Sequence, residues 1–250
     1  QHGRTMMQTY CFTIQPLSAF GTPLAGDTLF GQLCWTLRNQ LGNDRLNALL
    51  QNYTSGAPFA VVSDAMPAGH VPLPAVPSSL WTAQKEEGRK LLKKKRWLPH
   101  AAMTQPFAHW QAAACGDAEV AAQKERAQPH NTINRQTGTT GDGQFAPYAQ
   151  TQIWFKAETR FDVHVVLDEA RLSLADLTAA LDAMGTTGFG RDASIGLGKF
   201  KRIGDADTTT WPVATDTNSY LTLGPCALQG QGSCPARSFY QVVTLFLIPN

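Results

Sequence analysis

Two stretches of the 250-residue chain repeat one order of patterns, strand then helix then strand. The first unit spans residues 9–62 and the second spans residues 151–203. In each unit, a run that alternates polar and apolar side chains precedes an apolar stripe at helical spacing, and a second strand-like run follows the stripe. A pair of such units predicts one antiparallel sheet with both helices on one face.

Local signals place the ends of the two helices. Asp27 and Thr28 are candidate N-caps of the first helix. Ser173 caps the second helix, with Asp176 three residues later in the acidic position of a capping box, and Gly185 is expected to end it. The apolar stripes of the two helices are Leu29, Phe30, Leu33, Cys34, Leu37 and Leu41, and Leu174, Leu177, Leu181 and Met184.

These elements predict an α+β fold of the ferredoxin-like, or RRM-like, class with a βαββαβ core. In that class the helices leave one face of the sheet free, and RNA-binding domains of the RRM type use the free face. Residues 161–167 place Phe161, Val163, Val165 and Leu167 on the covered face. His164 falls on the other face, where we expect an exposed side chain.

The two units are separated by an insertion over about residues 66–150. Four prolines argue against a regular element in residues 66–77, and the Ala-, Gln-, Thr- and Gly-rich part that follows predicts a thumb-like projection. We expect residues 1–204 to form one domain that carries this insertion. Residues 205–250, with a strand at 219–223, are expected to begin a second, incomplete ferredoxin-like half.

Composition excludes several classes of protein. Lys and Arg number 21 against 19 Asp and Glu, so nucleic-acid binding would need local clusters of charge. A hydrophobic content of 43% excludes disorder for most of the chain. No apolar run reaches the roughly 18 residues of a membrane span. The five cysteines and six histidines show no metal-ligand spacing, so we expect no metal, no cofactor, no membrane and a cytoplasmic protein.

A glycine-rich loop lies between the second helix and its following strand. Glycines at this density let backbone N–H groups approach an anion closely, and the charged and hydroxyl side chains of the loop add donors. A plain tight connection would need fewer glycines. The candidate RNA-binding residues of the loop are Gly188, Gly190, Arg191, Ser194, Gly196, Gly198 and Lys199.

The same loop formally matches the dinucleotide fingerprint G-x-G-x-x-A, but in the wrong context. That motif follows a strand and opens a helix, whereas this loop follows a helix and leads into a strand. A nucleophile elbow around Ser194 fails because Asp192 replaces the first glycine. A P-loop fails because Phe200 follows Lys199. The sequence therefore argues against a nucleotide-binding enzyme.

The projection contains a second group of candidates. Amide, guanidinium and hydroxyl groups next to aromatic rings suit single-stranded RNA, whose bases need both edge contacts and stacking. A turn-rich loop with Asx turns is the alternative. The candidate RNA-binding residues here are Asn131, Asn134, Arg135, Thr137 and Phe145.

One strongly basic run precedes the projection. Residues 85–96 contain seven cations and two carboxylates, and Trp97 follows directly. This composition fits equally a nucleic-acid surface and a solvated helix face.

Three segments of the chain resemble the RAMP superfamily of CRISPR RNA-binding proteins. They are the glycine loop, residues 18–35, and residues 130–138 with 143–148. The resemblance is strongest to the fourth subunit of type III-A Csm complexes. It implies a non-catalytic protein that binds the 5′ tag of the CRISPR RNA and docks the large polymerase-like subunit. It also implies contact with backbone RAMP subunits and, through the complex, with target RNA.

An RNA endonuclease of the same superfamily is the alternative. It would use a histidine as general base, or Asp27, because related backbone subunits use an early-loop aspartate for target cleavage. No histidine here pairs with a basic catalytic partner in the sequence, and Asp27 is better explained as an N-cap. We therefore expect no catalytic residue.

Overall fold

The main sheet of the computed structural model contains five strands. The structure describes residues 7–82, 89–133, 135–141, 146–209, 211, 219–226 and 234–240. The strand order is β10-β1-β9-β2, every neighbouring pair is antiparallel, and β3 also pairs with β9. The bounds are β1 Gln8–Pro16, β2 Ala60–Val62, β3 Met66–Pro67, β9 Phe161–Leu167 and β10 Phe200–Thr208.

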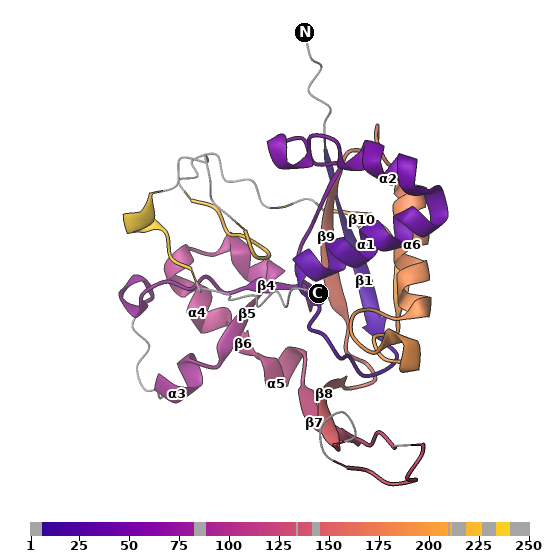
Figure 1. The fold of residues 1–250 in the computed structure, drawn as a ribbon. Helices are drawn as coiled ribbons and strands as arrows, with labels where there is room; N and C mark the ends of the chain where they lie inside the picture. The colour runs from indigo at the N-terminus through magenta and orange to yellow at the C-terminus, as the bar shows by residue number, and fades with distance from the viewer. Residues whose placement is uncertain are drawn as a thin grey trace.

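Three helices accompany this sheet: α1 Gly26–Leu41, α2 Asn43–Leu50 and α6 Leu174–Thr187. In Figure 1, α1 and α6 lie over the same face of the sheet. The chain order β1-α1-β2 and then β9-α6-β10 confirms the two predicted strand–helix–strand units.

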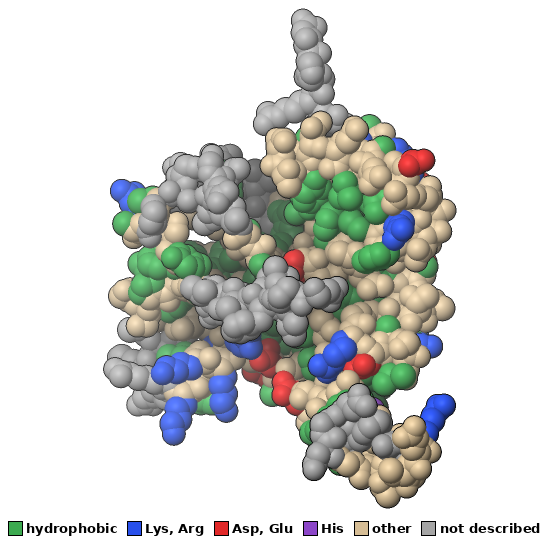
Figure 2. All heavy atoms as spheres, in the orientation of Figure 1, with side chains coloured by type: hydrophobic (Ala, Val, Ile, Leu, Met, Phe, Trp, Pro, Cys, Tyr) green, Lys and Arg blue, Asp and Glu red, His purple; other side chains and the backbone are tan. Residues whose placement is uncertain are grey.

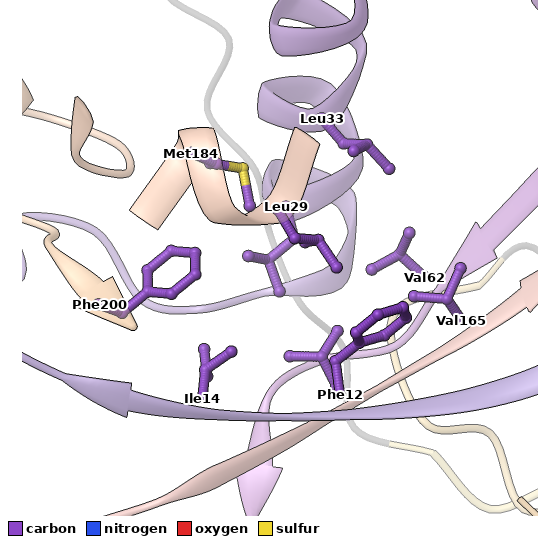
Figure 3. Close-up of a pocket in the computed structure, with 10 residues that line it drawn as sticks. Phe12, Ile14, Leu29, Leu33, Val62, Val165, Met184 and Phe200 are labelled. Atoms are coloured by element: carbon purple, nitrogen blue, oxygen red, sulfur yellow. The ribbon is translucent and has the colours of Figure 1, made fainter. Parts of the chain in front are cut away.

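The core lies between this sheet and the helices. Figure 3 shows Phe12 and Ile14 of β1, Leu29 and Leu33 of α1, and Met184 of α6 pointing into the same layer. Alternate residues of β1 are buried because they face the helices, and the residues between them are less buried. The layer leaves an apolar void of only about 10 Å³, which is too small for a ligand.

The helix signals are confirmed except at two ends. Ser173 Oγ accepts from the Asp176 N–H at 3.1 Å, as predicted for an N-cap. Gly185 does not end α6, which continues to Thr187, with Gly188 as its C-cap. Gly185 is needed inside the helix because a Cβ there would overlap the Phe200 carbonyl of β10. The second difference is at the start of α1, where Asp27 is not the N-cap.

The insertion contains more regular structure than its sequence predicts. Short strands β4, β5 and β6 form a small sheet, and β7 and β8 pair over eight positions as a long antiparallel ribbon. Figure 1 shows β7 and β8 extending away from the main sheet. The bounds are β4 His70–Pro72, β5 Lys95–Pro99, β6 Cys115–Gly116, β7 Gln123–His130, β8 Tyr148–Phe155, α3 Arg89–Leu92, α4 Trp110–Ala113 and α5 Asp117–Val120.

The prolines of residues 66–77 do not prevent strand formation. Pro67 is the last residue of β3 and Pro72 is the last residue of β4. At a strand end the missing N–H removes no hydrogen bond from the interior of a ladder. The expectation that this stretch holds no regular element is therefore wrong.

The face of the sheet opposite the helices is not free at β9. His164 is only 4% exposed, because the insertion and the chain after β10 cover it. Its ring centroid lies 6.2 Å from that of His100 and 4.7 Å from that of Trp211. Burial lowers the pKa of His164 to about 4, which keeps the imidazole neutral. The prediction of an exposed histidine on an open face is wrong here.

The strand predicted at residues 219–223 does not form. Residues 219–226 contain no strand, although the Asp64 N–H donates to the Leu223 carbonyl at 2.8 Å. Leu221 is 36% exposed, so this short run lacks the buried face that would order it as a strand. β10 itself continues to Thr208, past the expected domain boundary at 204. None of the described helices is long and apolar enough to cross a membrane.

Candidate nucleic-acid interface

The glycine loop folds back on itself between α6 and β10. The Phe189 N–H donates to the Gly198 carbonyl at 2.9 Å, which closes the loop at its base. A Cβ on Gly188 would overlap the Leu197 carbonyl, and a Cβ on Gly198 would overlap the Phe189 backbone. These two glycines are therefore required by the packing of the loop. The predicted helix–loop–strand context is confirmed.

The other two glycines differ in what surrounds them. Gly190 has φ +75°, and a Cβ there would lie 2.7 Å from the side chain of Thr22. Gly196 has φ +99°, and a Cβ there would meet nothing within 4 Å. Three of the four glycines thus have a packing role, and only Gly196 faces open space. The interpretation that all four make room for RNA stays a prediction.

The loop after β1 joins the glycine loop along its length. The Gly198 N–H donates to the Ala19 carbonyl at 2.7 Å, and the Lys199 N–H donates to Ser18 Oγ at 2.9 Å. The Arg191 N–H donates to Thr22 Oγ1, also at 2.9 Å. Two segments that lie more than 160 residues apart in sequence are therefore joined by backbone N–H groups that donate to one carbonyl and to two side-chain hydroxyls.

The β7–β8 ribbon is fixed to the same place. Phe20 exchanges two backbone hydrogen bonds with Ile153 of β8, at 2.8 and 2.9 Å. The ring of Phe20 packs between Phe155, at 5.9 Å, and Phe189, at 6.4 Å. The Arg191 guanidinium donates to the carbonyl of Thr151 at 2.8 Å. Two of the three segments that carried the family resemblance, the glycine loop and residues 18–35, thus meet at the base of the ribbon, and the third forms the turn at its other end.

One face of the ribbon carries polar and aromatic side chains. Cross-strand pairing places Lys124 opposite Trp154 and His130 opposite Tyr148, on the same face. The Arg126 guanidinium lies 5.8 Å from the centre of the Trp154 ring. The rings of His130 and Tyr148 stack at 5.4 Å with an interplanar angle of 16°. Trp154 is 43% exposed and Tyr148 is 49% exposed, so both rings reach solvent.

Sequence reasoning missed this ribbon face. Neither Arg126 nor Trp154 was among the candidates, because residues 123–130 show no apolar alternation. Every residue of β7 except His130 is exposed, so the strand has no buried face to reveal it. The remaining members of the face are Gln128, Gln150 and Gln152.

The predicted residues of the projection lie in the turn of the ribbon. Asn131, Arg135 and Thr137 are exposed, and Thr137 Oγ1 lies 3.0 Å from Thr139 Oγ1. Asn134 and Phe145 lie outside the described residues. Thr151, which Arg191 reaches, is three residues from the turn end of β8, about 10 Å along a strand. The two predicted groups therefore belong to one side of the molecule.

The remaining loop residues are accessible. Ser194 and Lys199 are exposed, and the Arg191 side chain is 49% exposed while it pairs with Asp192 at 3.1 Å. Arg191 Nη2 thus holds β8 and its Nε pairs with Asp192, while about half of the side chain still faces solvent.

Asp27 is not the N-cap of α1. The helix begins at Gly26, and Asp27 Oδ1 accepts from its neighbour, the Thr28 N–H, at 2.6 Å. The Gly26 N–H donates instead to Asp64 Oδ1 at 2.6 Å. Burial raises the pKa of Asp64, and the Asp27 carboxylate raises it further. The predicted capping role therefore belongs to a residue from a distant loop.

No metal-binding cluster of three or more His, Cys, Asp or Glu occurs among the residues that the structure describes. All five cysteines are free thiols. Burial raises the pKa of Cys11 to about 12 and that of Cys34 to about 11, so neither is a thiolate near neutral pH.

Comparison with known proteins finds resemblance in structure alone. No family model matches the sequence, and no curated protein matches it. A chain of the Csm3–Csm4 subcomplex of the type III-A CRISPR-Cas interference complex superposes with TM-score 0.52 and 12% identity, covering 81% of this chain and 70% of that chain. A chain of the Csm1–Csm4 cassette in complex with one ATP gives TM-score 0.50 and 14% identity, covering 82% and 72%.

A third structure, the type III-B Cmr-beta complex bound to cognate target RNA, matches with TM-score 0.45 and 8% identity. The match covers 81% of this chain and 61% of that one, so the chain spans less than two thirds of that relative. By its fold, the protein is similar to the RAMP-type subunits of type III CRISPR complexes.

Proposed function

We propose that the protein is a non-catalytic RNA-binding subunit of a type III CRISPR effector complex. In this proposal it binds the 5′ tag of the CRISPR RNA and docks the large polymerase-like subunit. One observation carries the proposal: the glycine loop, the loop after β1 and the β7–β8 ribbon are joined by hydrogen bonds into a single surface.

The ribbon face supplies what a single strand of RNA needs. Trp154 and Tyr148 offer exposed rings for base stacking, which contributes about 1–3 kcal/mol per base. The amides of Gln128 and Gln150, which are not buried, offer both donors and acceptors to base edges. Lys124 and Arg126 supply positive charge for phosphates on the same face.

The glycine loop supplies contacts to the RNA backbone. Gly196 has open space around its Cα, so a phosphate can approach the main chain there. Ser194 adds a hydroxyl donor, and Lys199 adds an exposed ammonium group. We assign the phosphates of the tag to this loop and its bases to the ribbon.

The fold supports the rest of the assignment. The order β10-β1-β9-β2 with α1 and α6 on one face is that of a ferredoxin-like core, and we propose that class. The structures with similar fold contain Csm4 together with Csm1 or Csm3. We propose corresponding partners here: a polymerase-like subunit, backbone RAMP subunits and, through them, target RNA in the prokaryotic cytoplasm.

The endonuclease alternative is favoured by one observation, the proximity of Asp27 to Asp64. The Asp27 carboxylate helps to raise the pKa of Asp64 at the start of α1. Replacement by Asn separates the two functions, because an amide accepts a hydrogen bond but carries no negative charge. In our proposal, complexes that carry Asp27→Asn still cleave target RNA at every site, because neighbouring subunits catalyse the cleavage. Loss of one site with assembly intact would establish the nuclease.

Recovery of the native complex tests RNA binding directly. We expect RNA that copurifies with the tagged full-length protein to consist of guides with a common repeat-derived 5′ end. The recovered guide should bind the isolated protein more tightly than the same RNA with its 5′ end replaced. Trp154→Ala should abolish that difference. Trp35→Ala is the matched control, because Trp35 is also exposed beside an arginine but lies on α1. No preference in the wild type would refute the proposal.

A further inference from the structure

The basic run of the insertion has no part in the candidate interface. Residues 85–96 hold seven of the 21 cations and two of the 19 carboxylates of the chain. The remainder of the chain therefore has 14 cations against 17 carboxylates and is net negative. Positive charge is concentrated in this one segment, whose described part runs from α3 through the turn at Lys93 and Lys94 to the start of β5.

Three lysines of this run have no structural role in the described part of the chain. Lys90, Lys93 and Lys94 are exposed, and their side chains form neither hydrogen bonds nor ion pairs there. Arg96 pairs with Asp117 at 3.3 Å but keeps 62% of its side chain exposed. Lys90 lies in α3 and Lys93 and Lys94 follow directly after it, so three like charges lie close together along the chain. These lysines add no contact to the described part of the fold and remain accessible to an anion.

The cluster is separate from the candidate interface. Figure 2 shows a group of blue side chains at the lower left of the molecule and another at the lower right, with red acidic side chains between them. The chain between the two basic regions runs through α5, which carries Asp117 and Glu119. An RNA strand on the ribbon would have to cross negative charge to reach the lysines. The two regions therefore do not form one continuous track.

We propose that Lys90, Lys93, Lys94 and Arg96 form a second nucleic-acid site, which binds the phosphate backbone of a single strand without regard to sequence. A lysine ammonium is a point charge on a flexible stem, so it neutralises phosphate but does not read bases. The other class of anionic partner is an acidic protein. Exposed ion pairs contribute little to protein association, whereas each lysine on a nucleic acid releases a condensed counterion.

Salt dependence of binding tests the site. The full-length protein is titrated with a fluorescent oligo-uridine of roughly 20 nucleotides from 50 to 200 mM salt. We expect the triple variant Lys90→Gln, Lys93→Gln, Lys94→Gln to reduce the slope of log K against log salt by about 2, since single strands release about 0.7 ions per phosphate contact. Affinity at 50 mM salt should fall at least about tenfold. Oligo-deoxythymidine should show the same change.

The control removes equal charge elsewhere. Arg38→Gln, Lys156→Gln, Arg160→Gln changes three exposed cations outside the insertion and should leave the slope unchanged. Equal slopes in the wild type and the lysine variant, or an equal reduction in the control, would overturn the proposal. So would an unchanged slope combined with loss of a protein subunit from the purified complex. The preference for the guide 5′ end should survive in the lysine variant, which separates this site from the ribbon.

Discussion

Alanine at Gly190 and at Gly196 should have unequal effects on stability. Both glycines have positive φ, which costs an alanine roughly 1–2 kcal/mol. A methyl group at Gly190 would also lie 2.7 Å from Thr22, so the threonine must move. That movement breaks the Arg191 N–H to Thr22 Oγ1 bond, worth about 1 kcal/mol. We expect Gly190→Ala to cost about 2–3 kcal/mol and Gly196→Ala about 1–2 kcal/mol.

Urea denaturation of the full-length variants, followed by circular dichroism, gives the comparison. Thr22→Val provides an independent control, since it removes the acceptor for Arg191 and leaves both glycines in place. Its cost should be about 1 kcal/mol. A larger loss for Gly196→Ala than for Gly190→Ala would refute the packing roles assigned to the loop.

The same variants distinguish packing from RNA contact. Gly196→Ala places its methyl group in the open space that we assign to a phosphate. We therefore expect it to weaken binding of the recovered guide RNA severalfold while the protein remains folded. Unchanged affinity would remove Gly196 from the interface.

Three further changes test the electrostatics and the helix ends. Asp64→Ala should cost about 1 kcal/mol in urea because the Gly26 N–H loses its acceptor, whereas Asp64→Asn should cost less; an equal cost would contradict the cap. The pKa of His164 is lowered to about 4, so stability should fall by up to about 3 kcal/mol as pH falls from 6.5 to 4, and His164→Gln should remove that slope. Arg171 donates to the carbonyls of Ala57 and Gln51, just after α2. Arg171→Lys should therefore lower the unfolding free energy by about 1–2 kcal/mol, and no change would show that Arg171 does not cap the C-terminus of α2.

The elements that the sequence predicted correctly depend on local patterns. The stripe that contains Leu29, Leu33 and Leu37 is buried as its helical spacing requires. Ser173 and Asp176 lie three residues apart, so the cap is complete within one turn. Such signals can be read without knowledge of the rest of the fold.

The errors at Asp27 and His164 share one cause, a contact with a residue far away in the sequence. Asp27 lies at the start of α1 and has a side chain typical of a cap, but Asp64 is the residue that accepts the hydrogen bond from the Gly26 N–H. His164 alternates as an exposed residue should, yet Trp211 and His100 cover it. Neither covering contact leaves a trace in the local pattern.

The candidate interface could be predicted only in part. Four glycines in one loop predicted close approach, but the partner of Gly190 is Thr22, whose position relative to the loop depends on the fold. The ribbon was missed because β7 is exposed on both faces and so has no hydrophobic period. Its aromatic face becomes visible only when the pairing register of β7 with β8 is known.

Ultraviolet cross-linking of the assembled complex, with peptides identified by mass spectrometry, shows directly whether the ribbon and the glycine loop bind the guide. We expect guide-RNA adducts on β8, at Tyr148 or Trp154, and on the glycine loop near Lys199. These residues are exposed and belong to elements that the structure joins. Adducts confined to the exposed face of α1 around Trp35, or a complex that contains no guide RNA, would contradict it.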